Sequence, residues 1–598
     1  MKRTGAGRCP GSMMTAQVIL GAAASRVAGE VRVGAVRVGL VLALLPLGAA
    51  WAGDGRPLST VDPSGVVAKP ASPSRPIALP AAPRAAEGDR IPRFVLVSAV
   101  FDGNKALPAA ALAGSWSALR GAKVSLADLS AIALRAEAIY ARRGYPFVAV
   151  VVTPQTIQDG VVHFRVVEGR IADIKVLGSD PVARRQASAA FGPLVNRHPL
   201  SSAAVETAYE RAKAVPGLAV AGSLRRGNAT GGMDLLLQSR RKAWSTYANI
   251  DNYYPDVVGP WGALVGVDHY GSSRYGDETS LQGYSSVSGG SQVVLRGSHQ
   301  RTINASGTTV SITALAAWAH PGGSVAPLDL ATRVYSGRIG VSQPLISRLG
   351  ASLTASAGLD LDNQTTKVFS SVGLTEDRLR IASVALAGEL RGRDGARLGF
   401  QLEGRKGLDL LGATHPGEVL SSRFGADPQA AVGRLSMEGE SPTVLMTRFV
   451  GRLEGQLASG ALTAPEQFVV GNLTLGRGYQ PGSAFGDEIL GGAAELRVGP
   501  FRTVRQLRLE PFVFCDVVRL WSLTPGAASS RTLSSFGAGL RIEAPGRMHV
   551  DLAYASPRSA PLGLGEPRPP GRVLVNVTVG LNDAFNAIHR RFTARAAR

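Results

Sequence analysis

Two short segments in the last quarter of the chain place a basic and an acidic residue among glycine and aromatic residues. The first is Gly476-Arg477-Gly478-Tyr479, and the second is Phe514-Cys515-Asp516. Glycine on both sides of an arginine permits a tight backbone tip that exposes the guanidinium group. A guanidinium and a carboxylate can form two parallel, charge-assisted hydrogen bonds. The chemistry that these residues predict is the anchoring of a loop.

Other residue types that catalyse reactions or bind metals do not form a recognisable site. The eight histidines are never at metal-ligand spacing, and the sequence contains no GxSxG, HExxH or GxxxxGK[ST] motif. We therefore expect no enzyme activity, no metal and no cofactor. A hydrolase that uses Asp268 and His269 is the alternative, but we expect His269 to be a polar residue that faces the interior of the strand array described next.

Residues from Trp244 onward alternate between apolar and polar side chains. Between 573 and 582, for example, valines at every second position alternate with Asn576 and Thr578. A period of two residues, repeated in many short segments, is typical of a transmembrane β-barrel with an apolar outer face. A soluble β-sandwich shows the same alternation but rarely in so many strands. We predict a closed antiparallel barrel over 243–585, with sixteen strands near 244–253, 260–270, 277–287, 291–300, 305–318, 330–342, 348–361, 377–391, 395–408, 430–440, 443–458, 488–498, 505–520, 533–544, 547–556 and 572–582.

The barrel prediction gives the two motifs a relative position. Arg508, Glu510 and Asp516 share one parity in the thirteenth predicted strand, so we expect all three to face the lumen. The loop 459–487, between the eleventh and twelfth strands, carries Arg477. If this loop folds into the barrel, Arg477 can pair with Asp516. An ordinary extracellular turn and an unrelated lumen-facing aspartate explain the same residues equally well.

Two α/β units are predicted ahead of the barrel, over 91–170 and 171–242. In the first, Ser125 and Asp128 form a capping box that begins a helix, and strands are expected near 148–152 and 161–167. In the second, helices are expected near 182–191 and 202–214, with strands near 171–176, 218–224 and 233–239. The edges of such sheets can accept an extended peptide as an additional strand.

The chain termini differ in composition from these units. An apolar run over 38–50, preceded by Arg32 and Arg37 and followed by Ala50-Trp51-Ala52, predicts a cleavable signal peptide over 1–52. Residues 53–90 are rich in proline and predict a linker, and 586–598 form a basic tail. The net charge of +21 suits a basic lumen and contact with anionic headgroups better than nucleic acid in an exported protein.

This order of elements resembles the two-partner secretion transporters (the TpsB family, haemolysin secretion/activation type), outer-membrane proteins with POTRA domains. The Gly476–Tyr479 segment is similar to the family's (V)RGY/F loop motif, and Phe514–Asp516 to its F-x-D-x-G strand motif. Val518 departs from the last glycine of that motif, and Gly476 stands where valine is usual. The first unit resembles a POTRA domain, and the resemblance implies substrate docking by positions Tyr140, Gly144, Tyr145, Glu168 and Gly169.

The resemblance implies a function in protein export. An unfolded exoprotein of the TpsA type, haemagglutinin- or haemolysin-like, would dock on POTRA domains in the periplasm and pass through the barrel to the cell surface without ATP. Arg477, Gly478 and Tyr479 would shape the loop tip, and Asp516 and Phe514 would hold it. Outer-membrane lipids and lipopolysaccharide would surround the barrel. An insertase that assembles other barrels shares the loop motif, and a passive porin is the remaining alternative.

Overall fold

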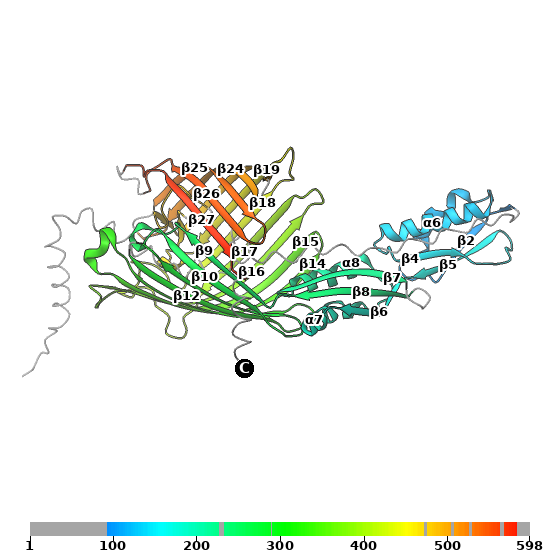
Figure 1. The fold of residues 1–598 in the computed structure, drawn as a ribbon, viewed down its shortest axis with the longest axis horizontal. Coiled ribbons are helices and arrows are strands. Elements are labelled where there is room, and N and C mark those ends of the chain that lie inside the picture. The colour runs from blue at the N-terminus through cyan, green and yellow to red at the C-terminus, as the bar shows by residue number, and fades with distance from the viewer. Residues whose placement is uncertain are drawn as a thin grey trace, which may run out of the picture.

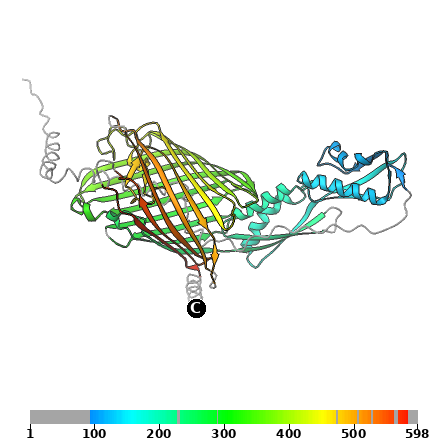
Figure 2. The same cartoon turned by 90° about the horizontal axis from the view of Figure 1, so that it is seen from above.

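The structure, a computed structural model, describes residues 93–226, 232–288, 290–471, 475–503, 507–525, 529–561 and 567–582. The predicted signal peptide, the linker and the basic tail lie outside these residues. The described chain forms two small α/β units followed by a large barrel, and the units extend in a row from one end of the barrel (Figure 1). Figure 2 shows the same arrangement from above.

The first α/β unit packs one long helix and several short ones against a three-stranded sheet. The sheet has the order β2-β5-β4, with β2 parallel to β5. Helix α6 begins at the predicted capping box, in which Ser125 accepts a hydrogen bond from the Asp128 N–H group and Asp128 accepts one in return. The elements are β1 (Phe94–Val95), β2 (Ser98–Asp102), α5 (Ala109–Leu112), η1 (Ala113–Ser115), η2 (Ser117–Leu119), β3 (Lys123–Val124), α6 (Leu126–Arg142), β4 (Val148–Val152) and β5 (Val161–Glu168).

The second unit packs two helices of similar length against its own three-stranded sheet. Its sheet has the order β6-β8-β7, with β6 parallel to β8. Asp180 and Ser201 cap the two helices through their side-chain oxygens, as their residue types favour. The elements are β6 (Arg170–Leu177), α7 (Pro181–Phe191), η3 (Gly192–Leu194), α8 (Ser202–Ala214), β7 (Leu218–Arg226) and β8 (Gly232–Arg241).

Within the described residues, sixteen antiparallel strands close into a barrel, in which β27 pairs with β9. The two-residue strand β23 only extends the β22–β24 turn. The strands are β9 (Trp244–Asp251), β10 (Gly262–Tyr270), β11 (Asp277–Ser286), β12 (Ser291–Thr302), β13 (Thr309–His320), β14 (Ala331–Arg348), β15 (Ala351–Val368), β16 (Val372–Arg391), β17 (Arg397–Gly407), β18 (Ala431–Glu440), β19 (Thr447–Ala458), β22 (Glu488–Val498), β24 (Arg508–Ser522), β25 (Ser529–Ala544), β26 (Met548–Pro557) and β27 (Arg572–Gly580), with β23 at Phe501–Arg502.

The predicted fold class, α/β units followed by a sixteen-stranded antiparallel barrel, is confirmed. The predicted alternation also holds in space. On β24, Phe512, Phe514 and Asp516 are buried toward the lumen. Val513 and Val517, of the opposite parity, are each more than half exposed on the outer face. The described helices include none that is long and apolar enough to cross a bilayer.

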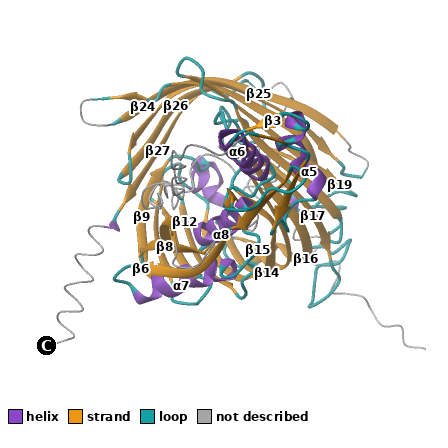
Figure 3. Cartoon of the chain, turned by 90° about the vertical axis from the view of Figure 1, so that its right-hand side faces the viewer, coloured by secondary structure: helices purple, strands orange, loops and turns teal. Residues whose placement is uncertain are grey.

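The second unit is attached to the barrel at residues 271–276. These residues form the turn between β10 and β11, on the side of the barrel that faces the units. Arg241 donates hydrogen bonds to the carbonyl oxygens of Tyr270 and Gly271, at 2.6 and 3.1 Å. Gln186 of α7 donates to the carbonyl oxygen of Ser273 at 3.0 Å. Seen along the barrel from the side of the units, α8 and α6 lie in front of the strands (Figure 3). The units therefore lie at one opening of the barrel.

Candidate functional site

The loop between β19 and β22 folds back as a short hairpin. Its described parts contain η6 (Ala464–Glu466) and the strands β20 (Phe468–Val470) and β21 (Ala484–Gly486), which pair with each other. The loop leaves the barrel at the end opposite the α/β units. Its tip, 475–479, is almost completely buried although it belongs to a loop. The burial follows from contacts with side chains that point into the lumen.

The structure brings Arg477 and Asp516 together on the lumen side of β24. The Arg477 Nη2 atom donates to the Asp516 Oδ1 atom at 2.7 Å, and its Nε atom lies 3.1 Å from Oδ2. The Arg477 backbone N–H group adds a third hydrogen bond to Oδ2, at 3.0 Å. Because both side chains are almost inaccessible to water, removal of Arg477 would leave the buried Asp516 carboxylate without a cation, which costs about 3–5 kcal/mol.

Two further wall residues complete the site, and sequence reasoning did not identify them. The Arg477 Nη1 atom donates to Glu495 Oε2 of β22 at 2.9 Å. Ser535 of β25 donates to Asp516 at 3.1 Å and accepts a hydrogen bond from the Gly478 N–H group at 3.2 Å. Glu495 shares the lumen-facing parity of Ala493 and stands opposite Phe514 in the strand register. Parity on this neighbouring strand was the signal that could have found it.

Aromatic residues from the loop and the wall enclose the ion pair. The guanidinium carbon of Arg477 lies 3.5 Å from the centre of the Phe514 ring, which is a cation–π contact. The Tyr479 hydroxyl donates to the Ser534 carbonyl oxygen at 2.9 Å, and the Tyr479 carbonyl oxygen accepts from Arg572 of β27 at 2.7 Å. The loop tip is thus bonded to β22, β24, β25 and β27.

A small apolar cluster supports the tip and accounts for both departures from the family motif. Val518 is buried within it, packed with Leu475 and Tyr479 of the loop and with apolar wall residues of β22 and β25. A side chain at position 518 is therefore accommodated because it fills this cluster. Gly476 has a φ angle of +74°, and a Cβ atom there would lie 2.6 Å from a Val470 methyl group. Glycine is therefore the residue that this backbone requires.

Of the five POTRA positions inferred from the family resemblance, Tyr140, Glu168 and Gly169 are buried, whereas Gly144 and Tyr145 are half-buried. Tyr140 is fully buried, and its hydroxyl donates to Asn104 at 2.6 Å. Glu168 accepts from the backbone N–H groups of Lys105 and Ala106 at 2.8 and 2.7 Å. Tyr145 packs against the hydrophobic core of the first unit, to which Tyr140 belongs.

The remaining two positions join the first unit to the second. Gly144 accepts a backbone hydrogen bond from Ser202, at the start of α8, at 2.9 Å. Gly169 accepts one from Leu200 at 3.2 Å. A Cβ atom at Gly169 would lie 2.3 Å from the Phe147 carbonyl oxygen. The backbone at 169 can therefore approach the backbone at 147 this closely only if residue 169 is a glycine. Gly144 and Gly169 thus help to fix the two units relative to each other, and direct contact of the five positions with substrate stays a prediction.

The alternative site at Asp268 and His269 does not assemble. Asp268 faces the lumen and accepts a hydrogen bond from Ser280 at 2.7 Å. His269 points outward, with the opposite parity, and its ring lies 4.3 Å from that of Trp244. The expectation that His269 faces the lumen was wrong because the strand parity places its aspartate neighbour there instead. Across the described residues, no group of histidine, cysteine and acidic side chains is arranged to bind a metal.

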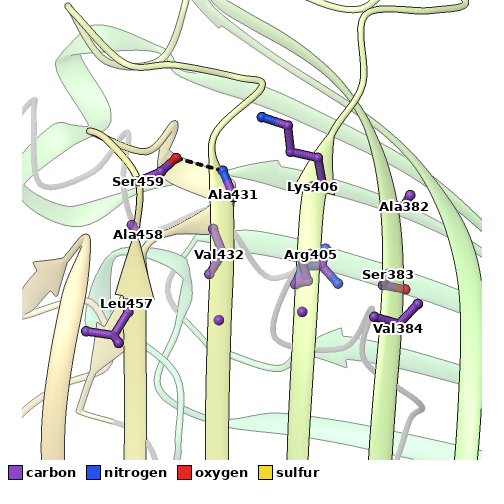
Figure 4. Close-up of a pocket in the computed structure, with 12 residues that line it drawn as sticks. Ala382, Ser383, Val384, Arg405, Lys406, Ala431, Val432, Leu457, Ala458 and Ser459 are labelled. Carbon is purple, nitrogen blue, oxygen red and sulfur yellow. Dashed lines mark hydrogen bonds between the residues drawn. The ribbon is translucent and has the colours of Figure 1, made fainter.

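An apolar hollow of about 520 Å³ lies on the outer surface of β16–β19 and is not part of the lumen. Gly404 and Gly433 line it without side chains, and Val384 and Leu457 line it with apolar ones. Lys406 and Ser459 lie toward the end that carries the loops (Figure 4). Because its lining is apolar and faces outward, the hollow suits an acyl chain and offers no catalytic groups.

Two family models match this chain, one in the first α/β unit and one in part of the barrel. Residues 94–169 match the model of the POTRA domain, ShlB-type. Residues 343–542 match the model of the haemolysin secretion/activation protein ShlB/FhaC/HecB. The second range includes the loop 459–487 and all of β24, so it contains both segments from which the site is built.

Relatives and solved structures agree with these matches. The heme/hemopexin transporter protein HuxB of Haemophilus influenzae is 21% identical over 449 residues, which are 73% of this chain and 78% of HuxB. CdiB from Escherichia coli superposes with a TM-score of 0.68 at 18% identity, covering 83% of this chain and 92% of CdiB. CdiB from Acinetobacter baumannii gives a TM-score of 0.60 at 14% identity, with 93% and 98% of the two chains covered.

Proposed function

This chain is an outer-membrane transporter of the two-partner secretion family, of the haemolysin secretion/activation type, and from this premise we propose how it exports its partner. The α/β units receive an unfolded exoprotein in the periplasm. The exoprotein then passes through the barrel. The loop 459–487, held by the contact of Arg477 with Asp516, controls whether the lumen is open or partly blocked.

The orientation of the chain in the membrane follows from the position of its units. The α/β units lie in the periplasm, so the barrel end that they face is the periplasmic opening. The opposite strand ends, where 408–430 and 459–487 leave the barrel, face the cell surface. The loop 459–487 therefore enters the lumen from the cell-surface side. An exoprotein arriving from the periplasm meets the loop tip only after it has entered the barrel.

The first contact with the exoprotein is proposed to be the addition of a strand to a sheet edge. In the described part of the chain, β2 and β7 each end a sheet and pair with one neighbour. An unfolded segment can bond to such an edge through its backbone, which requires little sequence specificity. The β4 edge is less suitable, because Glu137 of α6 already accepts the hydrogen bond of the Val150 N–H group at 2.8 Å. The fixed junction at Gly144 and Gly169 would hold β2 and β7 at a constant separation.

Passage through the lumen is proposed to follow the wall made by β12–β15. In the periplasmic half of this wall, Thr302, Thr309, Ser342 and Ser356 stand opposite one another in a continuous row of the strand register. Their strand neighbours Val310 and Val341 are exposed on the outer face, so the hydroxyl groups point inward. Short neutral hydroxyl groups can exchange weak hydrogen bonds with an extended backbone without holding it. No ATP is needed if the exoprotein folds outside and cannot return.

The observation that carries this proposal is a loop arginine buried in the lumen, with its backbone N–H group and all three guanidinium nitrogens bonded to the wall carboxylates Asp516 and Glu495. Burial of an ion pair costs desolvation free energy that its contacts must offset. Passive diffusion through a pore does not require such a contact, whereas a loop that must be held in a defined position does. A loop held in this way blocks part of the passage and must shift for a polypeptide to pass. The ion pair therefore sets the balance between the resting and conducting positions of the loop.

The test is export by an Arg477→Ala variant, measured as exoprotein released into the medium by cells that carry this chain and its partner. The partner is sought in the neighbouring reading frame. We expect export to be lost, because a loop tip without its anchor no longer returns to a defined position in the lumen. The barrel should still be inserted, as judged by heat-modifiable mobility in electrophoresis. The matched control is Arg519→Ala, an arginine on the outer face of β24, which should export normally. Normal export by the Arg477→Ala variant would refute the role of the loop.

The partners proposed beyond the exoprotein are the lipids that surround the barrel, including lipopolysaccharide. The outer surface is strongly apolar, with Val384, Leu402 and Leu453 among its exposed side chains. The hollow beside Gly404 and Gly433 fits one acyl chain, with Lys406 near the cell-surface end, where anionic headgroups lie. The chain is proposed to bind no nucleic acid and to catalyse no reaction.

A further inference from the structure

The arm of the loop that precedes its tip carries a second buried charge, Glu466, at the end of η6. Its side chain meets Arg405 of β17 in a two-pronged contact. The Arg405 Nη2 atom lies 3.0 Å from Glu466 Oε1, and the Arg405 Nε atom lies 3.1 Å from Oε2. The Arg405 side chain is only 3% exposed, and that of Glu466 is 10% exposed. This contact is therefore as well shielded from water as the pair at the loop tip.

Arg434 of β18 binds the same carboxylate from a second direction. Its Nη2 atom donates to Glu466 Oε2 at 3.3 Å and to the Glu466 carbonyl oxygen at 3.1 Å. Gln456 of β19 also donates to that carbonyl oxygen, at 3.2 Å. Two neighbouring arginines and one amide thus converge on one residue of the loop. This convergence fixes both the side chain and the backbone of Glu466.

Glu466 and Arg477 attach the loop to two separate groups of charges on the wall. Arg405 also binds Asp360 of β15 and Glu403 of β17, at 3.2 and 3.1 Å. Asp360 pairs in turn with an arginine of β14, so the first group extends over β14–β18. Arg477 binds Glu495, which in turn pairs with arginines of β22 and β25. The loop tip is therefore held by charges on β22 and β24, and further ion pairs continue this second group to β18 and to β26. The loop carries one member of each group, and it bridges two sectors of the barrel wall.

We infer that Glu466 is a positioning residue that forms a second lock on the loop 459–487, independent of the lock at Arg477. Release of one lock leaves the loop attached to the other sector, about which it pivots. Full withdrawal from the lumen requires both locks to open. This inference rests on the proposed function only for its meaning in export, because the position of the loop can be measured without an exoprotein.

The experiment measures ionic current through the purified full-length protein in planar lipid bilayers. Glu466→Gln removes the charge but keeps the size of the side chain. Loss of a charge-assisted contact of this kind should raise the open probability about tenfold or more. Arg434→Gln, which weakens the same contact from the wall side, should act in the same direction. Glu466→Asp keeps the charge, so its channel should stay mostly closed. If only the size of the side chain mattered, Glu466→Gln would stay closed and Glu466→Asp would not.

The matched control is Glu454→Gln, which removes a lumen-facing carboxylate that bonds to Ser436 on the neighbouring strand and not to the loop. Its current should equal that of the unmodified protein. The double variant Glu466→Gln, Arg477→Ala decides whether the locks are independent, because independent locks give an effect equal to the product of the single effects. We expect the double variant to conduct steadily.

Two results would overturn the inference. One is an unchanged current in both Glu466→Gln and Arg434→Gln with the barrel inserted. The other is a fully open channel in Arg477→Ala to which Glu466→Gln adds nothing. Neither result depends on export. Conversely, normal export by the Arg477→Ala variant would contradict the proposed role of the loop in transport. The current measurements would still show whether Glu466 holds the loop.

Discussion

The guanidinium group of Arg477 lies over the ring of Phe514, with 3.5 Å between the guanidinium carbon and the ring centre. Phe514 precedes Asp516 by two residues on β24, so both side chains point into the lumen from one strand. The strand therefore supplies a carboxylate to bind the edge of the guanidinium and an aromatic face to cover its plane. Cation–π contacts that are shielded from water contribute about 2 kcal/mol.

Phe514→Leu should weaken the anchoring of the loop without removing the ion pair. Leucine fills part of the space but has no aromatic face, so we expect a loss of about 1–2 kcal/mol and a more frequently open channel. The measurement is the open probability in planar bilayers. Phe512→Leu is the control, since Phe512 lies on the same face of β24 but covers Arg541 and not the loop arginine. Equal effects of the two variants would show that the ring over Arg477 has no special role.

Gly478→Ala should displace the loop tip although it changes no charge. A Cβ atom at this position would lie 2.7–2.9 Å from Pro557, Ser556 and Ser535, distances that real contacts do not tolerate. The tip must move away from β25 and β26, and the hydrogen bond from the Gly478 N–H group to Ser535 is lost. We expect a more frequently open channel, measured in planar bilayers. Gly433→Ala is the control, because a Cβ atom there meets nothing within 4 Å; its barrel should remain closed.

The fold could be predicted from the sequence because each strand carries its own signal. All sixteen predicted strands are present, since alternation is a local property that the membrane imposes on every crossing segment. The ends of the longest strands were placed less well. The strand predicted over 348–361 continues to Val368 as β15. Residues such as Asp362, Asn363 and Gln364 are polar on both faces of the strand, so the alternation ends before the strand does.

The candidate site could be predicted only in part, because the contacts made by the loop residues depend on the path of the loop through the lumen. Strand parity alone placed Asp516 in the lumen. The contact of Glu466 with Arg405 joins residues 61 positions apart, on a loop and on a strand that is not its neighbour. Parity assigns Arg405 to the lumen but cannot say which loop residue reaches it. The family resemblance likewise identified Tyr140 and Glu168 without showing that they are buried.

Glu168→Ala should destabilise the first α/β unit. It removes the acceptor for the backbone N–H groups of Lys105 and Ala106, and hydrogen bonds to a charged group contribute about 1.5–3 kcal/mol. The measurement is limited proteolysis of the intact protein, in which cleavage within the first unit should become faster. Asp102→Ala is the control, since its pair with His163 is more than half exposed on both sides and contributes little. Similar cleavage of the Glu168→Ala variant and the unmodified protein would contradict the structural role.

The attachment of the second unit to the barrel should weaken in acid because of Asp180. Its carboxylate caps α7 and binds Arg241, the residue that bonds to the first barrel turn. Partial burial alone would raise the pKa of Asp180, but the hydrogen bonds from Arg241 and from the backbone N–H groups of Ala183 and Val182 outweigh it and hold the pKa below its usual value. A lowered pKa means that the contribution is fully present above the unfolded value of about 4 and is lost as the pH falls through the lower folded value.

Asp180→Asn isolates the ionic part of this contribution, since asparagine is as good a helix cap as aspartate. We expect the exchange of α7 backbone amides with deuterium, after correction for the intrinsic effect of pH, to be faster than in the unmodified protein near neutral pH. The difference should shrink in acid, as the pH falls through the lowered pKa of Asp180 and the aspartate is itself protonated. Asp180→Ala also removes the cap, which contributes about 1 kcal/mol, and should stay faster at every pH. If the asparagine variant matched the unmodified protein at pH 7, the bond between Asp180 and Arg241 would not hold the second unit in place.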